Sequence, residues 1–327
     1  MKKTEGIFYA TLFAIILLWG PGLEECRGAE QFPSRPITII INYGAGGQTD
    51  IVLRLMSKLA EKDLGVPLVI ENKAGGGGVV GITELARSKP DGYTIGSLTV
   101  GAMSATPAIQ TVPYDSFKDF DYICGFGRYL YGVWARTDSP FNTLRDVAEA
   151  ARKNPGKVTY GSMNLANAIG LKYLELKENV KMTYIPLQSG QDVVTSLAGG
   201  HIHLSISTPD AVLQFVENKE IKGLAVIGPE RWAFFPNIPT MKELGYDVDV
   251  TGWMGLGGPR GIPKERVAVI YDAFKKAHSD PEVKATLEKL WLYAPYITGE
   301  ETKAIYQKRA TEWKPLIDAI KTKQTKK

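Results

Sequence analysis

Cysteine is nearly absent from this sequence of 327 residues, which contains only Cys26 and Cys124. If the N-terminal segment is removed on export, as argued below, Cys26 is lost and no intramolecular disulfide can form. Cys124 lies in an apolar context and is expected to be a small buried hydrophobe. Stability must then come from core burial, and a mature chain of roughly 300 residues exceeds the usual size of one core, which favours two domains.

Clustered basic residues are also lacking. The formal net charge is +4, and removing residues 1–28 leaves it unchanged because equal numbers of basic and acidic residues are lost. A nucleic-acid-binding protein normally carries a basic face with interleaved aromatic residues, so no nucleic-acid partner is expected. The mild positive balance suits attraction of a small anion into a cleft.

After residue 30, no apolar run approaches the roughly 20 residues that span a bilayer. The shorter run at 7–19 follows two lysines and precedes a Gly-Pro break, which is the pattern of a cleavable export signal. Small residues before Glu30 suit cleavage, so residues 1–28 are predicted to be a signal peptide of a periplasmic protein. A lipid anchor at Cys26 is the alternative, and the acidic residues just before it disfavour that interpretation.

The short motifs of common enzyme classes are missing as well. The sequence contains no H-E-x-x-H, C-x-x-C, G-x-S-x-G or Walker loop. His201 and His203 share one strand face and resemble half of a metal site, but no third ligand is near in sequence, so a structural or edge-of-cleft role is favoured. We therefore expect a protein that is not an enzyme and has no catalytic residues, metal or cofactor.

What the sequence does contain is an alternation of apolar β-rich runs with helical patterns, which predicts an α/β fold with parallel sheets covered by helices. A capping box at Thr143 opens one helix, which ends before Asn154. Strands are predicted at 37–41, 68–70, 93–98, 132–136, 158–160, 182–185, 203–207 and 223–227. Other helices are predicted at 51–60, 81–88, 263–279 and 300–320.

Two segments mark where the chain could cross between lobes. The Gly/Pro-rich stretch 252–263 is the strongest change in composition, and 126–131 is its counterpart. The first lobe is then predicted to be discontinuous, built from 29–128 plus 253–327. The second lobe, 129–252, is inserted between these parts, and the ligand cleft lies between the lobes.

The most informative loop is Tyr43-Gly-Ala-Gly-Gly-Gln-Thr-Asp50, between a predicted strand and a predicted helix. Glycines let main-chain N–H groups approach a ligand, and the start of a helix adds partial positive charge, so a carboxylate or phosphate could be held there. In the alternative interpretation, Thr49 and Asp50 only cap the helix. Polar turns at 161–167 and 187–192 also follow strands, where open α/β sheets bind ligands, although Asn164, Ser189 or Asp192 could equally be ordinary N-caps.

A second glycine-rich loop, 74–81, formally satisfies G-x-G-x-x-G after a strand and before a helix. A dinucleotide site would also need an acidic residue about 20 positions further on, and the sequence has none there. The dinucleotide interpretation is therefore disfavoured.

Several segments carry a resemblance when they are taken in order. They are Phe32–Ile41, Gly46–Asp50, Glu71–Gly75, Lys89–Thr94, Asn154–Ser162, Leu197–Ile202, Pro236–Thr240 and Gly252-Trp253. In this order and spacing they resemble the extracytoplasmic substrate-binding receptors of tripartite tricarboxylate transporters (Bug/TctC-like), over nearly the whole mature chain. The second-lobe loop departs from the family pattern at Asn164, Ala166, Asn167 and Gly170, and His203 stands where the family has an aspartate.

The resemblance implies a two-lobed periplasmic-binding-protein, or Venus flytrap, architecture with a mostly parallel sheet in each lobe. It also implies a monomer that captures a small carboxylated solute and delivers it to membrane subunits of such a transporter. Together with the loops above, it points to ligand-binding residues at Tyr43, Ala45, Gly46, Gly47, Gln48, Thr49, Asp50, Thr99, Ser104, Ser162, Asn164, Asn167, Gln188, Ser189 and Gly190. A solute sensor for a signalling partner and an exported enzyme on the same fold are the alternatives. The solute could be a di- or tricarboxylate, an aromatic carboxylate or an amino acid.

Overall fold

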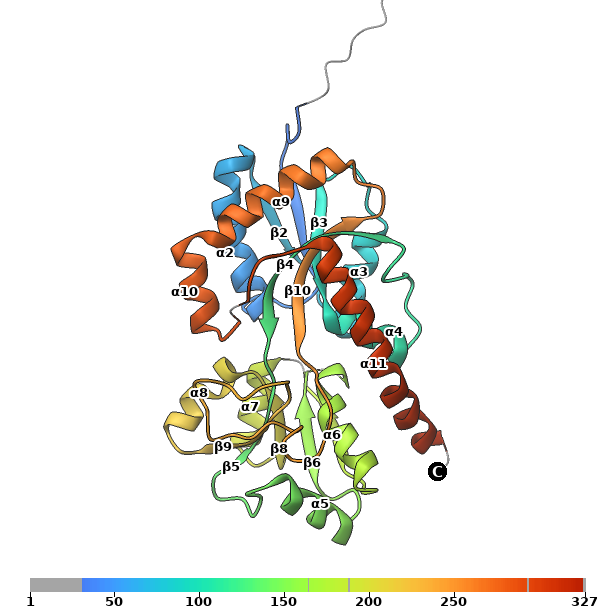
Figure 1. Cartoon of the computed structure of the whole chain (residues 1–327), viewed down its shortest axis with the longest axis vertical. Coiled ribbons are helices and arrows are strands. Elements are labelled where there is room, and N and C mark those ends of the chain that lie inside the picture. The colour runs from blue at the N-terminus through green and yellow to red at the C-terminus, as the bar shows by residue number, and fades with distance from the viewer. Residues whose placement is uncertain (1–30, 164, 188, 293, 326–327) are drawn as a thin grey trace, which may run out of the picture.

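The computed structural model describes residues 31–163, 165–187, 189–292 and 294–325, and it places two sheets one above the other (Figure 1). The sheet of the upper lobe has the strand order β11-β4-β10-β3-β1-β2, and that of the lower lobe has the order β7-β6-β8-β5-β9. The upper strands are β1 (Ile37–Ile41), β2 (Leu68–Asn72), β3 (Thr94–Thr99), β4 (Phe120–Tyr129), β10 (Gly252–Pro259) and β11 (Ile297–Thr298). The lower strands are β5 (Gly132–Arg136), β6 (Thr159–Ser162), β7 (Thr183–Pro186), β8 (Leu204–Ser207) and β9 (Ile221–Val226).

Helices cover both faces of the upper sheet because side chains of a strand point alternately to its two sides. Ile39 packs in one core with α2 and α9, whereas Ile40 packs with α3 in another. The helices of this lobe are α2 (Gln48–Leu64), α3 (Val79–Ala86), α4 (Thr106–Ile109), α9 (Lys264–Ser279), α10 (Pro281–Lys289) and α11 (Gly299–Thr325), with short turns at Gly76–Gly78 and Gly101–Ala105. Cys124 is fully buried, as expected, and burial raises the pKa of its thiol to about 12.

The lower lobe is also layered. Val133 of β5 packs on the side of α5 (Leu144–Lys153) and α6 (Leu165–Lys177), and Trp134 packs on the side of α7 (Gly190–Ala198) and α8 (Pro209–Glu217). The predicted capping box of α5 is confirmed: Thr143 Oγ1 accepts a hydrogen bond from the Asp146 N–H at 3.2 Å, and the Asp146 carboxylate accepts one from the Thr143 N–H at 2.8 Å. Among the described residues, no helix is both long and apolar enough to cross a bilayer.

The prediction of a mostly parallel sheet in each lobe is wrong, because both sheets are mixed. Strands β1, β2 and β3 are parallel, but β10 is antiparallel to both β3 and β4. In the lower sheet, β5 is antiparallel to β8 and β9. The reason is the discontinuous upper sheet: β4 leads the chain toward the lower lobe, and β10 returns from it, inserted between β3 and β4. A returning strand in that position must run against its neighbours.

The glycine-rich segment predicted as a crossover contains this returning strand. Its glycines are explained by close packing within the sheet, because a Cβ at Gly252 would overlap the side chain of Val100, and a Cβ at Gly257 would meet Leu98. Low β-propensity hid the strand in the sequence, since glycine is normally depleted in strands and is kept where another backbone or side chain approaches closely. The predicted boundary at 128/129 falls one residue before the end of β4.

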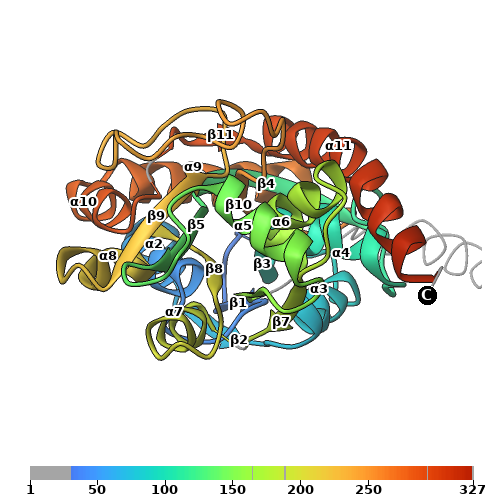
Figure 2. The same cartoon turned by 90° about the horizontal axis from the view of Figure 1, so that it is seen from below.

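The C-terminal helix α11 begins in the upper lobe and runs down beside the lower one, against α6 (Figures 1 and 2). Arg309 donates to the Thr251 carbonyl at 3.1 Å and pairs with Asp249 at 2.5 Å. Trp313, which is 2% exposed, donates its indole N–H to the Asp249 carbonyl at 2.9 Å. The returning crossover is therefore held in place by α11.

We expect Gly252→Ala to lower the free energy of unfolding by about 1–3 kcal/mol, because the added methyl group overfills the space beside Val100. Urea unfolding followed by circular dichroism measures this loss. Gly44→Ala is the matched control, since a Cβ at Gly44 would meet nothing within 4 Å. Equal unfolding midpoints for the two variants would contradict the packing explanation.

Candidate functional site

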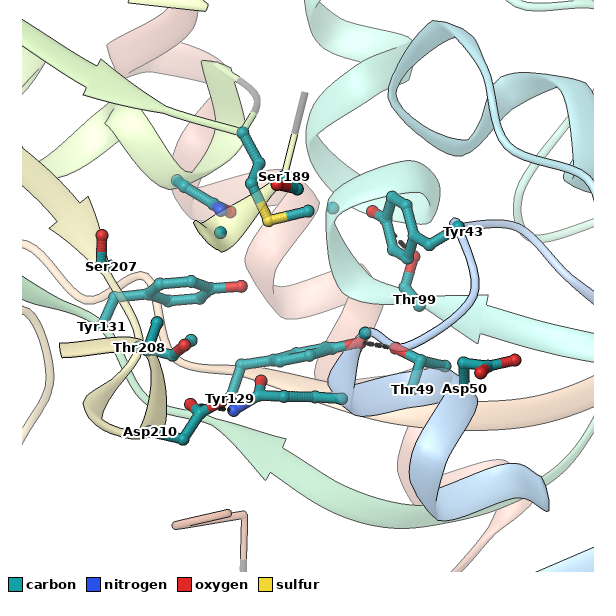
Figure 3. Close-up of a pocket in the computed structure, with 18 of the residues that line it drawn as sticks. Tyr43, Thr49, Asp50, Thr99, Tyr129, Tyr131, Ser189, Ser207, Thr208 and Asp210 are labelled. Atoms are coloured by element: carbon teal, nitrogen blue, oxygen red, sulfur yellow. Dashed lines mark hydrogen bonds between the residues drawn. The ribbon is translucent and has the colours of Figure 1, made fainter. Parts of the chain in front are cut away.

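A cavity of about 460 Å³ lies between the two sheets. Its walls come from segments that follow strands in both lobes: the loop after β1, the ends of β3 and β4, and the turns after β6, β7 and β8 (Figure 3). The carboxyl ends of strands from both lobes therefore meet at one place, which is where open α/β sheets bind ligands.

The loop after β1 leads directly into α2, whose N-terminus opens on the cavity. Gly47 is the N-cap and provides no side-chain cap, and the first hydrogen bond of the helix runs from the Ile51 N–H to the Gly47 carbonyl at 2.9 Å. The N–H groups of Gln48 and Thr49 therefore have no acceptor within the helix. Such groups at the positive end of a helix form an anion-binding position.

The Asp50 carboxylate maintains the shape of this loop. It accepts hydrogen bonds from the Gly46 N–H, from Arg54 Nε and from the Asn72 amide, each at 2.9 Å, and its side chain is only 4% exposed. Burial alone would raise the pKa of Asp50, but these hydrogen bonds and the charge of Arg54 outweigh it and lower the pKa below its usual value. Asp50 therefore lines the cavity as an ionised carboxylate, and both of its oxygens already accept hydrogen bonds from protein groups.

Hydroxyl groups form the wall beside this loop. Thr49 and Tyr129 are hydrogen-bonded through their hydroxyls at 2.5 Å, and Thr99 donates to the Tyr43 hydroxyl at 3.3 Å (Figure 3). Burial raises the pKa of Tyr43 and that of Tyr129. Both phenols are therefore neutral and can donate as well as accept hydrogen bonds.

The lower lobe contributes a second helix start. Ser189 is the N-cap of α7 and accepts a hydrogen bond from the Asp192 N–H at 3.1 Å, so the capping interpretation of this serine is confirmed. It also lines the cavity, as do Gly190 and the buried side chain of Asn167. A capping role and a place in the cavity wall are therefore compatible at Ser189.

Most of the sequence-predicted residues come together at this cavity. Those that line it are Tyr43, Ala45, Gly46, Gly47, Gln48, Thr49, Asp50, Thr99, Asn167, Ser189 and Gly190. Ser104 and Ser162 lie behind the wall: Ser104 donates to the Tyr306 carbonyl at 2.9 Å, and Ser162 donates to the Tyr184 hydroxyl at 3.3 Å. Asn164 and Gln188 lie outside the described residues, as does the predicted signal peptide.

Sequence reasoning missed two groups of lining residues. Tyr129 and Tyr131 belong to the crossover that was predicted only as a connection. Ser207 ends β8, and Thr208 and Asp210 follow it in a polar turn of the same kind as those singled out after β6 and β7, so the same signal could have found them. Val250 and Trp313 also line the cavity and have no such signal, because only the docking of α11 brings Trp313 there.

One hydrogen bond crosses the cavity from lobe to lobe. The Gln48 amide donates to the Asp210 carboxylate at 2.5 Å and to the Leu290 carbonyl at 3.3 Å. Burial raises the pKa of Asp210, although hydrogen bonds from Thr208, from main-chain N–H groups and from Gln48 act in the opposite direction. Burial therefore disfavours the ionised form of Asp210, which lies on the side of the lower lobe that lines the cavity.

Residues of the crossover between β4 and β5 line two different cavities, and Tyr131 lines both of them. Tyr129 lines the cavity just described, whereas Arg128 and Leu130 line a second cavity of about 390 Å³. There Phe234 of the lower lobe lies against Trp291 of the upper lobe, with ring centroids 3.6 Å apart.

Two other sequence features lie outside the cavity lining. His203 accepts a hydrogen bond from the Thr159 N–H at 3.1 Å through its Nδ1 atom, and its ring lies edge-on to Phe141. In the second glycine-rich loop, a Cβ at Gly81 would lie 2.9 Å from the Asn42 Cα. Close packing against the backbone just after β1 therefore explains this glycine.

We expect Asp50→Ala to lower the free energy of unfolding by about 1–3 kcal/mol, because it leaves buried donors at Gly46 and Asn72 without an acceptor. Hydrogen exchange of the peptide 43–50 should also become faster. The control is Asp63→Ala near the other end of α2, which removes an exposed ion pair with Lys276 and should cost about 0–1 kcal/mol. Unchanged exchange in Asp50→Ala would show that the carboxylate does not hold the loop.

Comparisons with known proteins agree with this geometry. A family model described as tripartite tricarboxylate transporter family receptor matches residues 52–322. The UPF0065 protein in the gbd 5′ region of Cupriavidus necator is 33% identical over 294 residues, which cover 89% of each chain. The structure of the periplasmic binding protein BugD aligns with a TM-score of 0.77 at 27% identity, covering 88% of this chain and 98% of that one.

A further solved structure is MatC from Rhodopseudomonas palustris with bound malate. It aligns with a TM-score of 0.76 at 24% identity, covering 88% of this chain and all of that one, a level of identity that supports the fold alone. The two-lobed α/β architecture is thus the periplasmic-binding-protein fold. The family match extends over most of the sequence, and the chain belongs to the receptor family of tripartite tricarboxylate transporters.

Proposed function

We propose that this protein is a periplasmic receptor that captures a small carboxylated solute in the cavity between its lobes. The observation that carries the proposal is the uncapped N-terminus of α2, whose free N–H groups open on that cavity. Among the described lining residues there is no lysine, arginine or histidine. A ligand carboxylate would therefore be held by main-chain dipoles and hydroxyl donors.

The comparisons support a carboxylate as the ligand. The matching family is described as a receptor of tripartite tricarboxylate transporters. The solved structure of MatC, which has a similar fold, contains bound malate. The hydroxyl groups of Thr49, Thr99 and Tyr129 supply further donors beside the helix. We propose that the predicted residues lining the cavity form the ligand site, with Tyr129, Tyr131 and Asp210 added to them.

We also propose the steps that precede and follow capture. Residues 1–28 would direct export and then be removed, which leaves a mature monomer in the periplasm. Rotation of the lobes about the crossovers would enclose the solute, and the closed form would be recognised by the membrane subunits of a tripartite tricarboxylate transporter. No chemical step is assigned to the bound solute, because the matching family is described as a receptor and the fold is that of a periplasmic binding protein.

Gly47→Val should raise the Kd for the solute by at least about tenfold, because its methyl groups would stand beside the N–H groups of the first turn. The fold should survive, since a Cβ at Gly47 meets only the Gly44 carbonyl oxygen at 3.6 Å. Mass spectrometry of the solute that co-purifies identifies the ligand, and calorimetry gives the Kd. Lys58→Val, on the exposed face of the same helix, is the control.

A normal Kd in Gly47→Val would remove the α2 N-terminus from the site. Recovery of the solute in altered form after incubation would favour an enzyme over a receptor.

Delivery to a transporter is tested in cells. Deleting the gene should abolish uptake of the radiolabelled solute identified above, and re-expression of the wild type, but not of Gly47→Val, should restore it. Unimpaired uptake, together with loss of a transcriptional response to the solute, would instead indicate a sensor.

A further inference from the structure

Asp210 is a charged residue of the cavity that the binding of an anion does not explain. It lies in the first turn of α8, after Pro209, on the face of the lower lobe that opens on the cavity. Figure 3 shows it on the same side as Tyr131 and Thr208, across from the α2 loop. A carboxylate in this position repels any negative group that approaches it.

The other acidic side chain of the lining differs in one respect. Asp50 is compensated by Arg54, which approaches it to 2.9 Å. The partners of Asp210 are neutral: the Gln48 amide, the Thr208 hydroxyl and main-chain N–H groups at the start of α8. With no cationic side chain among the described lining residues, Asp210 is the one lining charge without an opposite charge beside it.

The surroundings of Asp210 suit a cation. Tyr131 lies on the same side of the cavity as Asp210 (Figure 3), and burial raises the pKa of its phenol, with a smaller contribution from the charge of Asp210. The rings of Tyr129 and Tyr131 stack with centroids 6.1 Å apart, and aromatic faces of this kind attract ammonium groups. A ligand ammonium would also offset the cost of keeping the carboxylate ionised away from water.

The spacing of the two ends limits the size of the ligand. Gln48 contributes a free N–H to the anion-binding end, and its side chain reaches Asp210 at the other end. Only one glutamine side chain therefore separates the two positions. A small ligand that carries its negative and positive groups close together fits this arrangement.

We propose that the solute is a small zwitterion, an amino acid, whose carboxylate is held at the start of α2 and whose ammonium group pairs with Asp210. This inference rests on the receptor function proposed above. It distinguishes among the solute classes that the sequence left open. A hydroxy acid or a simple dicarboxylate would leave Asp210 unpaired, or would place a second negative charge beside it.

The test compares ligands that differ only at the ammonium group. Calorimetry is carried out on the full mature protein, freed of bound solute, with aspartate against malate, glutamate against 2-hydroxyglutarate, and alanine against lactate. In at least one pair, the wild type should bind the amino acid at least about tenfold more tightly. Asp210→Asn should remove most of that preference while it still binds the hydroxy acid.

A matched control distinguishes an effect of Asp210 on folding from its effect on ligand preference. Glu217→Gln removes one negative charge from the exposed C-terminal end of the same helix, and it should leave the preference unchanged. Thermal unfolding of each variant without ligand shows whether Asp210→Asn is folded. If it is not, Asp210→Glu, which keeps the charge, should retain the preference for the amino acid.

Each outcome decides between the proposals. If the wild type binds a hydroxy acid as tightly as its amino partner in every pair, or if Asp210→Asn keeps the preference, the zwitterion proposal is wrong. The receptor function still stands in that case, provided that Gly47→Val abolishes binding. If no carboxylate of either kind binds, both proposals are overturned.

Discussion

The site depends on a helix that is left uncapped at the edge of a cavity. The first N–H groups of α2 have no acceptor within the helix, and Gly47 supplies no side-chain cap for them. The loop that presents them keeps its shape because the Asp50 carboxylate binds the Gly46 N–H, Arg54 and Asn72. The Asp50 carboxylate is therefore used by the loop, and the start of α2 lies open toward the cavity, where we propose that the anion binds.

The second constraint is the double crossing between lobes. Strand β10 returns between β3 and β4, which makes the upper sheet mixed and places both crossovers beside the cavity. Tyr129 and Tyr131 therefore lie where the two lobes meet. The residues that connect the lobes are also residues that line the cavity. Helix α11 holds the returning segment through Arg309 and Trp313, so the lower lobe is connected to a helix of the upper lobe as well as to its sheet.

The proposed binding of an anion in a cavity whose described lining has no cationic side chain has a consequence for specificity. Main-chain dipoles and hydroxyl groups share the negative charge of a bound carboxylate among several hydrogen-bond donors. The position of the carboxylate is therefore defined by the geometry of these donors as much as by charge. In such a neutral surrounding, a single ionised group has a large influence. Asp210 is the lining carboxylate that has no cationic partner among the described lining residues, and in the proposed complex it selects the ligand by the sign of its second functional group.

Local patterns were sufficient for most of the strands, for helices α2, α3, α5, α9 and α11, for the capping box at Thr143, and for placing the loop Tyr43–Asp50 at the start of a helix, but they did not predict strands β4, β10 and β11. These features depend on neighbours in the chain, and their signals are short-range. The mixed sheets, the burial of Ser104 and Ser162 behind the wall, and the arrival of Tyr131, Asp210 and Trp313 at the cavity depend on strand order and on the docking of α11. Sequence spacing does not encode which side chain at a strand end turns toward the other lobe, because sheet twist and long-range packing decide that direction.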